Sequence, residues 1–245
     1  MSRIAIIAAM PGELKPLVKG WKSLPTGQRF VYKWTATFGD NECVAVCAGM
    51  GADAATRAFA QAEKDGPLDA VLSIGWVGAL QNEGFPGEFF IPNIVVNAQT
   101  GERFTLAERD KPVVLVTTTH VANEAEKRRL AATYGGSVVD MESAAVARLA
   151  QMHGIPVCCM KITTDEVSAR LPDLNPFIDR MGQMKMGRFI AHVLVRPKYW
   201  AALSRLGKAS SAGADHIAGA LPDLLARLTL QDFNELNRTG LIPDW

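Results

Sequence analysis

Three carboxylates follow apolar runs of this sequence, at points where a strand is expected to end. Asp165 closes IPVCCMKITT (155–164), Glu142 lies within VVDMESAAVARLA (138–150), and Glu13 follows the first apolar run after Pro-Gly. A carboxylic acid that keeps its proton can protonate a leaving group, and an ionised one can activate water or accept hydrogen bonds from hydroxyl groups. These three residues are therefore the first candidates for catalysis.

Each carboxylate also has a structural interpretation. Asp165 is a plausible N-cap for the segment that follows it. Glu142 begins a helix, where the helix dipole alone favours a negative charge, and Glu13 fits a solvated position on a short helix. As a general acid at neutral pH, Asp165 would need a pKa about three units above the ordinary value of about 3.9, which is roughly 4 kcal/mol of interaction.

Two glycine-rich segments are candidates for ligand contact through backbone N–H groups. Gly49-Met50-Gly51-Ala52 precedes an Ala-rich helix, and Gly75–Gly78 follows a strand as an expected turn. The dinucleotide fingerprint is G-x-G-x-x-G after the first strand, with an acid that closes the next strand. Here Ala54 takes the third glycine position and Asp69 opens the next strand, so NAD binding is disfavoured.

The composition is that of one large globular domain. The 245 residues are 48% hydrophobic and 21% charged, and 26 basic residues nearly balance 25 acidic ones. A net charge of +1 offers no overall electrostatic footprint for nucleic acid or for an acidic membrane surface. The four cysteines lie in apolar runs without a CxxC pair, so buried thiols are favoured over disulfides or a zinc site.

No targeting or membrane-spanning segment is predicted. The apolar run near the start is shorter than that of a signal peptide, and no stretch of about 18 apolar residues occurs. We therefore expect a cytoplasmic protein.

Strands and helices alternate along the chain. Strands are expected at 3–9, 31–38, 42–48, 68–74, 88–98, 112–118, 137–139 and 155–164. Helices are expected at 13–18, 53–64, 123–133 and 141–153, and through most of 177–228 with a break at Arg196-Pro197. The pattern predicts a three-layer α/β fold, with a mixed, largely parallel central sheet and helices on both faces. In such sheets ligands bind beyond the carboxyl ends of strands, where the candidate carboxylates lie.

Five motifs occur in the order and spacing of a known superfamily: IAIIAAMPGEL, AGMGADAA, SIGWVGAL, VVDMESAAVA and KITTDE. Over about residues 3–195 the chain resembles the purine nucleoside phosphorylase/uridine phosphorylase superfamily, and it is most similar to 5′-methylthioadenosine/S-adenosylhomocysteine nucleosidases. The resemblance implies a nucleoside phosphorylase-like catalytic domain at 1–195. A helical extension at 196–245 is expected to pack on it, and the role of residues 229–245 is left open.

Matched position by position, the resemblance implies a role for each candidate. Asp165 is the catalytic acid, which protonates or hydrogen-bonds N7 of a purine, and Glu13 is the base that activates water. Met141 packs under the ribose and Glu142 holds its 2′ and 3′ hydroxyls. The remaining substrate-binding residues expected are Trp76, Gly78, Val121 (with the base-contacting segment near His120) and Thr164.

Departures from the nucleosidase pattern leave the substrate open. Trp76 replaces a small residue of the Gly-rich turn, Ala79 replaces its last glycine, and the segment from Gly78 to Val113 is shorter. The C-terminal sequence looks more like the hopanoid-associated phosphorylase branch, to which removal of adenine from an adenosyl-hopane precursor is assigned.

Hydrolysis is favoured over phosphorolysis, because neither the first-strand loop nor Gly75–Gly78 carries the arginine that a phosphate site uses. Arg29, Arg57 and Arg103 could reach the site only if the fold brought them there. No cofactor or metal is expected, and phosphate is a co-substrate only if the enzyme is a phosphorylase. The expected partner is a small-molecule nucleoside, and the assembly a homodimer or higher homo-oligomer.

Two other classes of function remain open. A non-catalytic nucleoside-binding module would have no need of Asp165. An interaction protein is suggested by the apolar residues at helical spacing between Tyr199 and Leu228, although a helix packed on its own domain explains them better.

Overall fold

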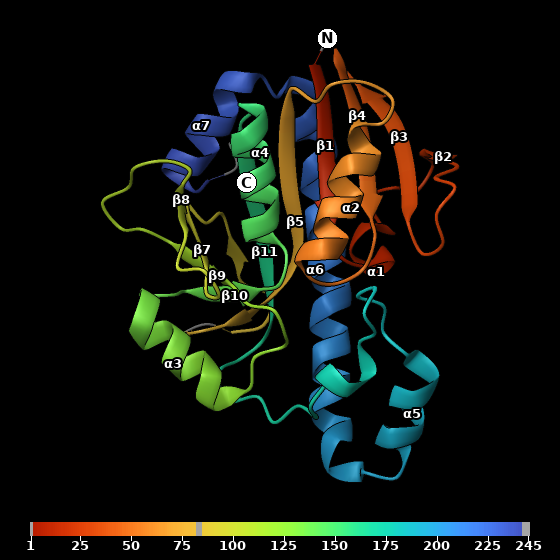
Figure 1. The fold of residues 1–245 in the computed structure, drawn as a ribbon, viewed down its shortest axis with the longest axis vertical. Coiled ribbons are helices and arrows are strands. Elements are labelled where there is room, and N and C mark those ends of the chain that lie inside the picture. Colours follow the sequence, from red (N-terminus) through yellow and green to blue (C-terminus); the bar gives the residue numbers. More distant parts are fainter. Residues whose placement is uncertain (1, 82–84, 242–245) are drawn as a thin grey trace.

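A mixed β-sheet runs through the computed structural model, which describes residues 2–81 and 85–241 (Figure 1). Its strands are β1 (Ser2–Ala8), β2 (Lys22–Leu24), β3 (Tyr32–Phe38), β4 (Asn41–Cys47), β5 (Ala70–Ala79), β6 (Phe89–Phe90), β7 (Ile94–Asn97), β8 (Arg103–Thr105), β9 (Val114–Thr117), β10 (Val138–Asp140) and β11 (Val157–Asp165). The order in the sheet is β2-β3-β4-β1-β5-β10-β9-β7-β8, and β11 pairs with β5 and β6. Parallel pairing joins β1 to β4 and β5, and β5 to β11.

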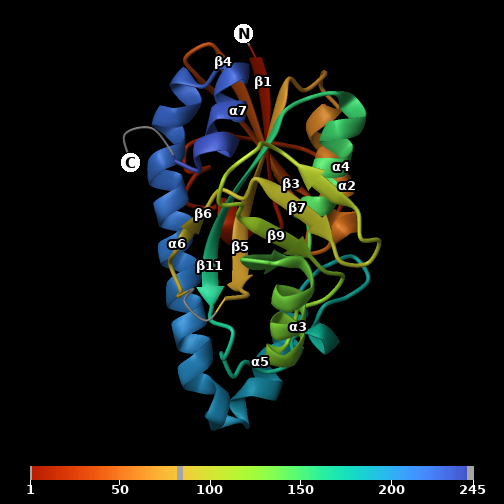
Figure 2. The ribbon, with the colours of Figure 1, turned by 90° about the vertical axis from the view of Figure 1, so that its left-hand side faces the viewer.

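Helices cover both faces of this sheet, with α2 and α4 on one side and α6 and α7 on the other (Figure 2). The helices are α1 (Pro11–Leu14), α2 (Ala52–Glu63), α3 (Glu124–Tyr134), α4 (Ser143–His153), α5 (Met186–Leu194), α6 (Trp200–Arg227) and α7 (Leu230–Thr239). Short 3₁₀ helices are η1 (Asn175–Phe177) and η2 (Pro197–Tyr199). The predicted three-layer α/β fold with a mixed sheet is confirmed.

Burial of both faces of β1 explains why its residues from Ile4 to Ala8 are all apolar. Ile4 and Ile6 belong to the core cluster that includes α6, whereas Ala5 and Ile7 belong to the cluster formed with α2 and α4. Successive side chains of a strand point to opposite faces, so a strand covered by helices on both sides has no solvent-facing positions.

The largest correction concerns the turn expected at Gly75–Gly78. Strand β5 continues to Ala79, because β11 runs beside it and supplies ladder partners for Trp76 and Val77. Beyond them, Gly78 and Ala79 pair with β10. The segment with the Gly-rich motif is therefore a strand that crosses the middle of the sheet, and Trp76 projects from it.

Smaller differences occur elsewhere. Residues 88–98 contain two short strands, β6 and β7, in place of one, and α1 begins at Pro11 and ends at Leu14. No helix covers residues 178–185, and the short strands β2 and β8 were not predicted. In the described part of the chain, no helix combines the length and apolar character needed to cross a membrane.

Candidate active site

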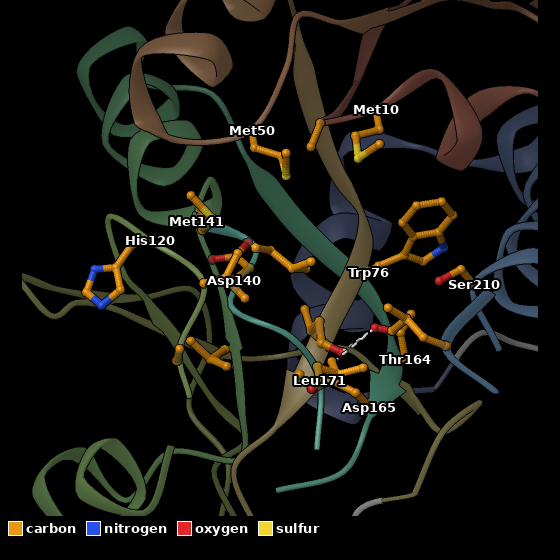
Figure 3. Close-up of a pocket in the computed structure, with 18 of the residues that line it drawn as sticks. Met10, Met50, Trp76, His120, Asp140, Met141, Thr164, Asp165, Leu171 and Ser210 are labelled. Atoms are coloured by element: carbon orange, nitrogen blue, oxygen red, sulfur yellow. Dashed lines mark hydrogen bonds between the residues drawn. The ribbon is translucent and has the colours of Figure 1, made fainter. Parts of the chain in front are cut away.

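A cavity of about 270 Å³ lies at the end of the sheet where β5 and β11 finish (Figure 3). It is lined by the eight predicted catalytic and substrate-binding residues: Glu13, Trp76, Gly78, Val121, Met141, Glu142, Thr164 and Asp165. A second cavity of about 650 Å³ adjoins it, and Lys127 and Asp165 line both. The fold therefore brings together residues that are up to 152 positions apart in the chain.

Glu13 is buried, and backbone N–H groups hold both of its carboxylate oxygens. Ala9 N and Met10 N donate to Oε2 at 2.8 and 2.7 Å, and Trp76 N donates to Oε1 at 2.9 Å. Burial raises the pKa of Glu13, although these hydrogen bonds oppose the rise. Gly75 makes the approach possible, since a Cβ there would lie 2.5 Å from Oε1. A carboxylate with a raised pKa is a stronger base toward water.

Glu142 directly precedes α4, and its side chain turns into the site. Gly51 N donates to its Oε1 at 2.6 Å, and Met141 N donates to Oε2 at 3.1 Å. Burial, and next the charge of Asp140, raise the pKa of Glu142 to about 8. The Gly49-x-Gly51 turn therefore presents an N–H group to a carboxylate of the same chain.

A buried ion pair lies beneath the two glutamates. Lys161 Nζ is 3.3 Å from Asp140 Oδ2 and donates to Ser73 Oγ at 3.0 Å. Asp140 also accepts from Thr117 Oγ1 at 2.7 Å and from Ser143 N at 3.0 Å. Burial lowers the pKa of Lys161, but the surrounding acids outweigh it and raise the pKa. This network fixes the start of α4 and so the position of Glu142.

Asp165 ends β11, and its carboxylate is engaged by Lys127. The buried Lys127 ammonium donates to Asp165 Oδ2 and, at 3.0 Å, to the carbonyl oxygen of Glu166. Thr164 Oγ1 donates to Asp165 Oδ1 at 3.2 Å. The Asp165 carboxylate thus faces a cation at the edge of the cavity. The N-cap interpretation instead predicts that it would accept hydrogen bonds from backbone N–H groups.

Trp76 fills the wall opposite Met141 and Asp140, on the side of Ser210 (Figure 3). Its indole occupies the space beside Gly12, where a Cβ would lie 2.9 Å from Cη2. The indole Nε1 is buried and has no hydrogen-bond partner among the described residues, so it is a donor that a ligand could use.

Beyond Trp76 the cavity wall is apolar and comes from the C-terminal part of the chain. Its members are Leu171, Leu174, Met184, Phe189, Leu203 and Leu206. Apolar walls with a few convergent polar groups are typical of small-molecule sites.

The backbone of Val121 is already hydrogen-bonded. Val121 N donates to Asn175 Oδ1 at 2.8 Å, and Asn175 Nδ2 donates to Val121 O at 3.1 Å. His120 also lines the cavity, but its ring bonds Glu126 at 2.8 Å and is about half exposed. The side-chain amide of Asn175 offers one acceptor and one donor to this backbone, as the edge of an adenine base does.

The family model of the phosphorylase superfamily matches residues 3–122 and 111–194, which is most of the chain. The chain belongs to the phosphorylase superfamily. This confirms the resemblance found in the sequence motifs, and with it the prediction of an enzyme of nucleosidase or phosphorylase type.

Solved structures share the fold of this superfamily member. 5′-Methylthioadenosine/S-adenosylhomocysteine nucleosidase of Helicobacter pylori has a TM-score of 0.69 at 15% identity, over 93% of this chain and 99% of its own. Futalosine hydrolase of the same organism has 0.69 at 15%, over 93% and 98%. The 5′-methylthioadenosine nucleosidase of Arabidopsis thaliana has 0.67 at 18%, over 95% and 99%. No curated protein sequence matches the chain.

Lys127, Asp140 and Lys161 were not among the predicted site residues of this superfamily member. Lys161 did leave a signal, because a lysine inside the apolar run CCMKITT must find a buried partner. Lys127 left none, since EAEKRRL reads as a solvated helix face. Only the tertiary fold, in which α3 packs beside β9, brings Lys127 to Asp165.

Proposed function

We propose that this enzyme hydrolyses the N-glycosidic bond of an adenosine-type nucleoside that carries an apolar 5′ substituent. The observation that carries the proposal is the convergence of Glu13, Glu142 and Asp165 on one cavity. Three carboxylates with different surroundings can perform three different tasks at one pH.

In the proposed reaction the Lys127 ammonium supplies a proton, through the Asp165 carboxylate that it contacts, to N7 of the base, which leaves as a neutral molecule. The ribosyl group gains positive charge as the bond breaks. Glu142 hydrogen-bonds the 2′ and 3′ hydroxyls above Met141, and the ionised Glu13 offsets that charge. Glu13 removes a proton from the water that attacks C1′, so the products are free base and free sugar.

Hydrolysis is supported by the cations near the site. Among the described residues, no arginine lines the 270 Å³ cavity. Arg57 donates to the carbonyl oxygens of Ala48 and Met181, and Arg29 lies over the ring of Phe30. A phosphate co-substrate would need donors of this kind aimed into the cavity.

The apolar wall supports a second candidate, phosphate-dependent release of adenine from an adenosyl-hopane precursor. Leu203 and Leu206 from α6 and Phe189 from α5 line the same cavity as the carboxylates, and a large hydrocarbon group attached at C5′ would bury against them. This candidate differs from the first in its nucleophile and in the size of the 5′ group.

The test is chromatography of reactions with adenosine, inosine, methylthioadenosine, S-adenosylhomocysteine and 5′-alkylthioadenosines of increasing chain length, each with and without phosphate. We expect adenine release that is independent of phosphate, with kcat/KM rising with alkyl length. Release only with phosphate, and with a sugar 1-phosphate as product, would assign the second candidate. No free base in any reaction at high enzyme concentration would refute both.

A further inference from the structure

The outer face of α5 is apolar and exposed. Met186, Ile190 and Leu194 recur every four residues and form one stripe along the helix, and Val195 and Trp200 follow. These five side chains, here called the tip surface, are 49–73% exposed. None of the residues of α5 is buried, although this helix is strongly amphipathic.

The tip surface is continuous because Trp200 packs on the end of α5. Trp200 Nε1 donates to the carbonyl oxygen of Val193 at 2.9 Å. The inner face of α5 is anchored, with the rings of Phe189 and His192 at 5.5 and 5.0 Å from that of Phe177. In both ribbon views α5 and the start of α6 form the end of the molecule opposite α7 (Figures 1 and 2). A helix in this position ordinarily turns polar residues outward, so the exposed stripe indicates a partner.

The segment that carries the tip surface is rich in basic residues. Of the 26 basic and 25 acidic residues in the chain, seven basic and one acidic lie within residues 179–208. The basic residues are Arg180, Lys185, Arg188, Arg196, Lys198, Arg205 and Lys208. Within the described residues, Lys185, Arg188 and Arg205 have no carboxylate within ion-pair distance. The near-neutral chain therefore concentrates positive charge at one end and leaves an acidic excess elsewhere.

We propose that the tip surface docks on the surface of a bilayer rich in anionic lipids. Apolar side chains flanked by lysine and arginine enter the headgroup region while the cations pair with lipid phosphates. Trp200 is suited to that interface, since its ring is apolar and its N–H is polar. A second copy of the chain fits less well, because a symmetric contact through this face would set the two cationic clusters against each other. The proposal does not depend on the proposed reaction.

The experiment is co-sedimentation of the full chain with vesicles of phosphatidylcholine alone, or of equal parts phosphatidylcholine and phosphatidylglycerol, at low and high salt. We expect binding to the mixed vesicles that weakens with salt. Lys185→Gln/Arg188→Gln should lower the partition coefficient about 25-fold, at about fivefold for each charge. Ile190→Glu/Leu194→Glu should lower it by at least about tenfold for each side chain.

Met152→Glu is the matched control, since Met152 is exposed on α4, outside the tip surface. It should bind vesicles as the unsubstituted chain does, and all variants should keep their melting temperatures because the substituted side chains are exposed. Equal binding by Ile190→Glu/Leu194→Glu and the control would overturn the proposal. The proposal would also be overturned if the chain bound no vesicles and light scattering showed a dimer that the Ile190→Glu/Leu194→Glu variant could not form. That result would assign the tip surface to contact with a second copy of the chain.

Discussion

Lys127 on α3 donates a hydrogen bond from its buried ammonium group to the carboxylate of Asp165 at the end of β11. The two residues are 38 positions apart, and the pair lies where the 270 and 650 Å³ cavities meet. In the proposed reaction the Lys127 ammonium orients the carboxylate of Asp165 and places a proton donor beside the leaving base.

Asp165→Asn should lower kcat by about 10²–10⁴-fold, because the amide has no proton to transfer to the base. Lys127→Met should also lower kcat, and Lys127→Arg should restore part of the loss, since a guanidinium can still hold the carboxylate. Initial rates of adenine release and thermal melts of each variant measure this. An Asp165→Asn enzyme with full activity would show that another group is the acid.

The raised pKa of Glu142 predicts how stability changes with pH. In the folded protein the carboxyl keeps its proton up to about pH 8, whereas in the unfolded chain it loses the proton near its ordinary pKa of 4.5. Its contribution to the free energy of unfolding is present in full below pH 4.5 and is lost as the pH rises toward 8.

Urea titrations at about pH 5, 6.5 and 8 measure this effect, with Glu142→Gln as the control. Because glutamine does not titrate, the wild-type protein should lose stability relative to this variant as the pH rises. Stability curves that run parallel across this range would contradict the assignment of the raised pKa to Glu142.

Gly75 should tolerate no side chain. Its φ is +141°, and an added Cβ would lie 2.5 Å from Oε1 of Glu13, so Gly75→Ala strains the backbone and displaces the proposed base. We expect a loss of about 2–4 kcal/mol in stability together with loss of activity. Gly101→Ala is the matched control, since Gly101 also has a positive φ, of +75°, but its Cβ would meet nothing within 4 Å. That variant should cost only about 1 kcal/mol and remain active; equal effects of the two substitutions would exclude a specific role for the contact with Glu13.

Lys161→Met should destabilise the fold by about 3–5 kcal/mol, because it leaves Asp140 charged, buried and without its cation. The double variant Lys161→Met/Asp140→Asn should recover part of this loss, since no uncompensated charge remains. Chemical denaturation of the three proteins provides the comparison. If the single variant is as stable as the wild type, the pair does not hold the start of α4.

Much of the fold follows from local pattern. The hairpin β3–β4 around Gly39-Asp40, the helix α2 and the strands β1 and β11 lie within a few residues of their expected positions, because each has a clear apolar period or a turn signal. The prediction of a turn at Gly75–Gly78 was wrong because contacts with residues far along the chain decide the structure of this segment. Glycines are typical of turns, but here the neighbouring strand β11 supplies the hydrogen bonds that extend β5.

The sequence by itself determined the α/β class, the superfamily motifs and eight of the residues that line the cavity, because motif order and strand ends are properties of neighbouring residues. Tertiary structure alone decided that Lys127 meets Asp165, that Lys161 and Asp140 pair beneath the glutamates, and that α5 and α6 supply an apolar wall. Those contacts join elements far apart in the chain, and a lysine on a helix has the same local pattern whether it faces water or a carboxylate. Packing selects between the two, since a buried charge must find a partner that only the folded chain provides.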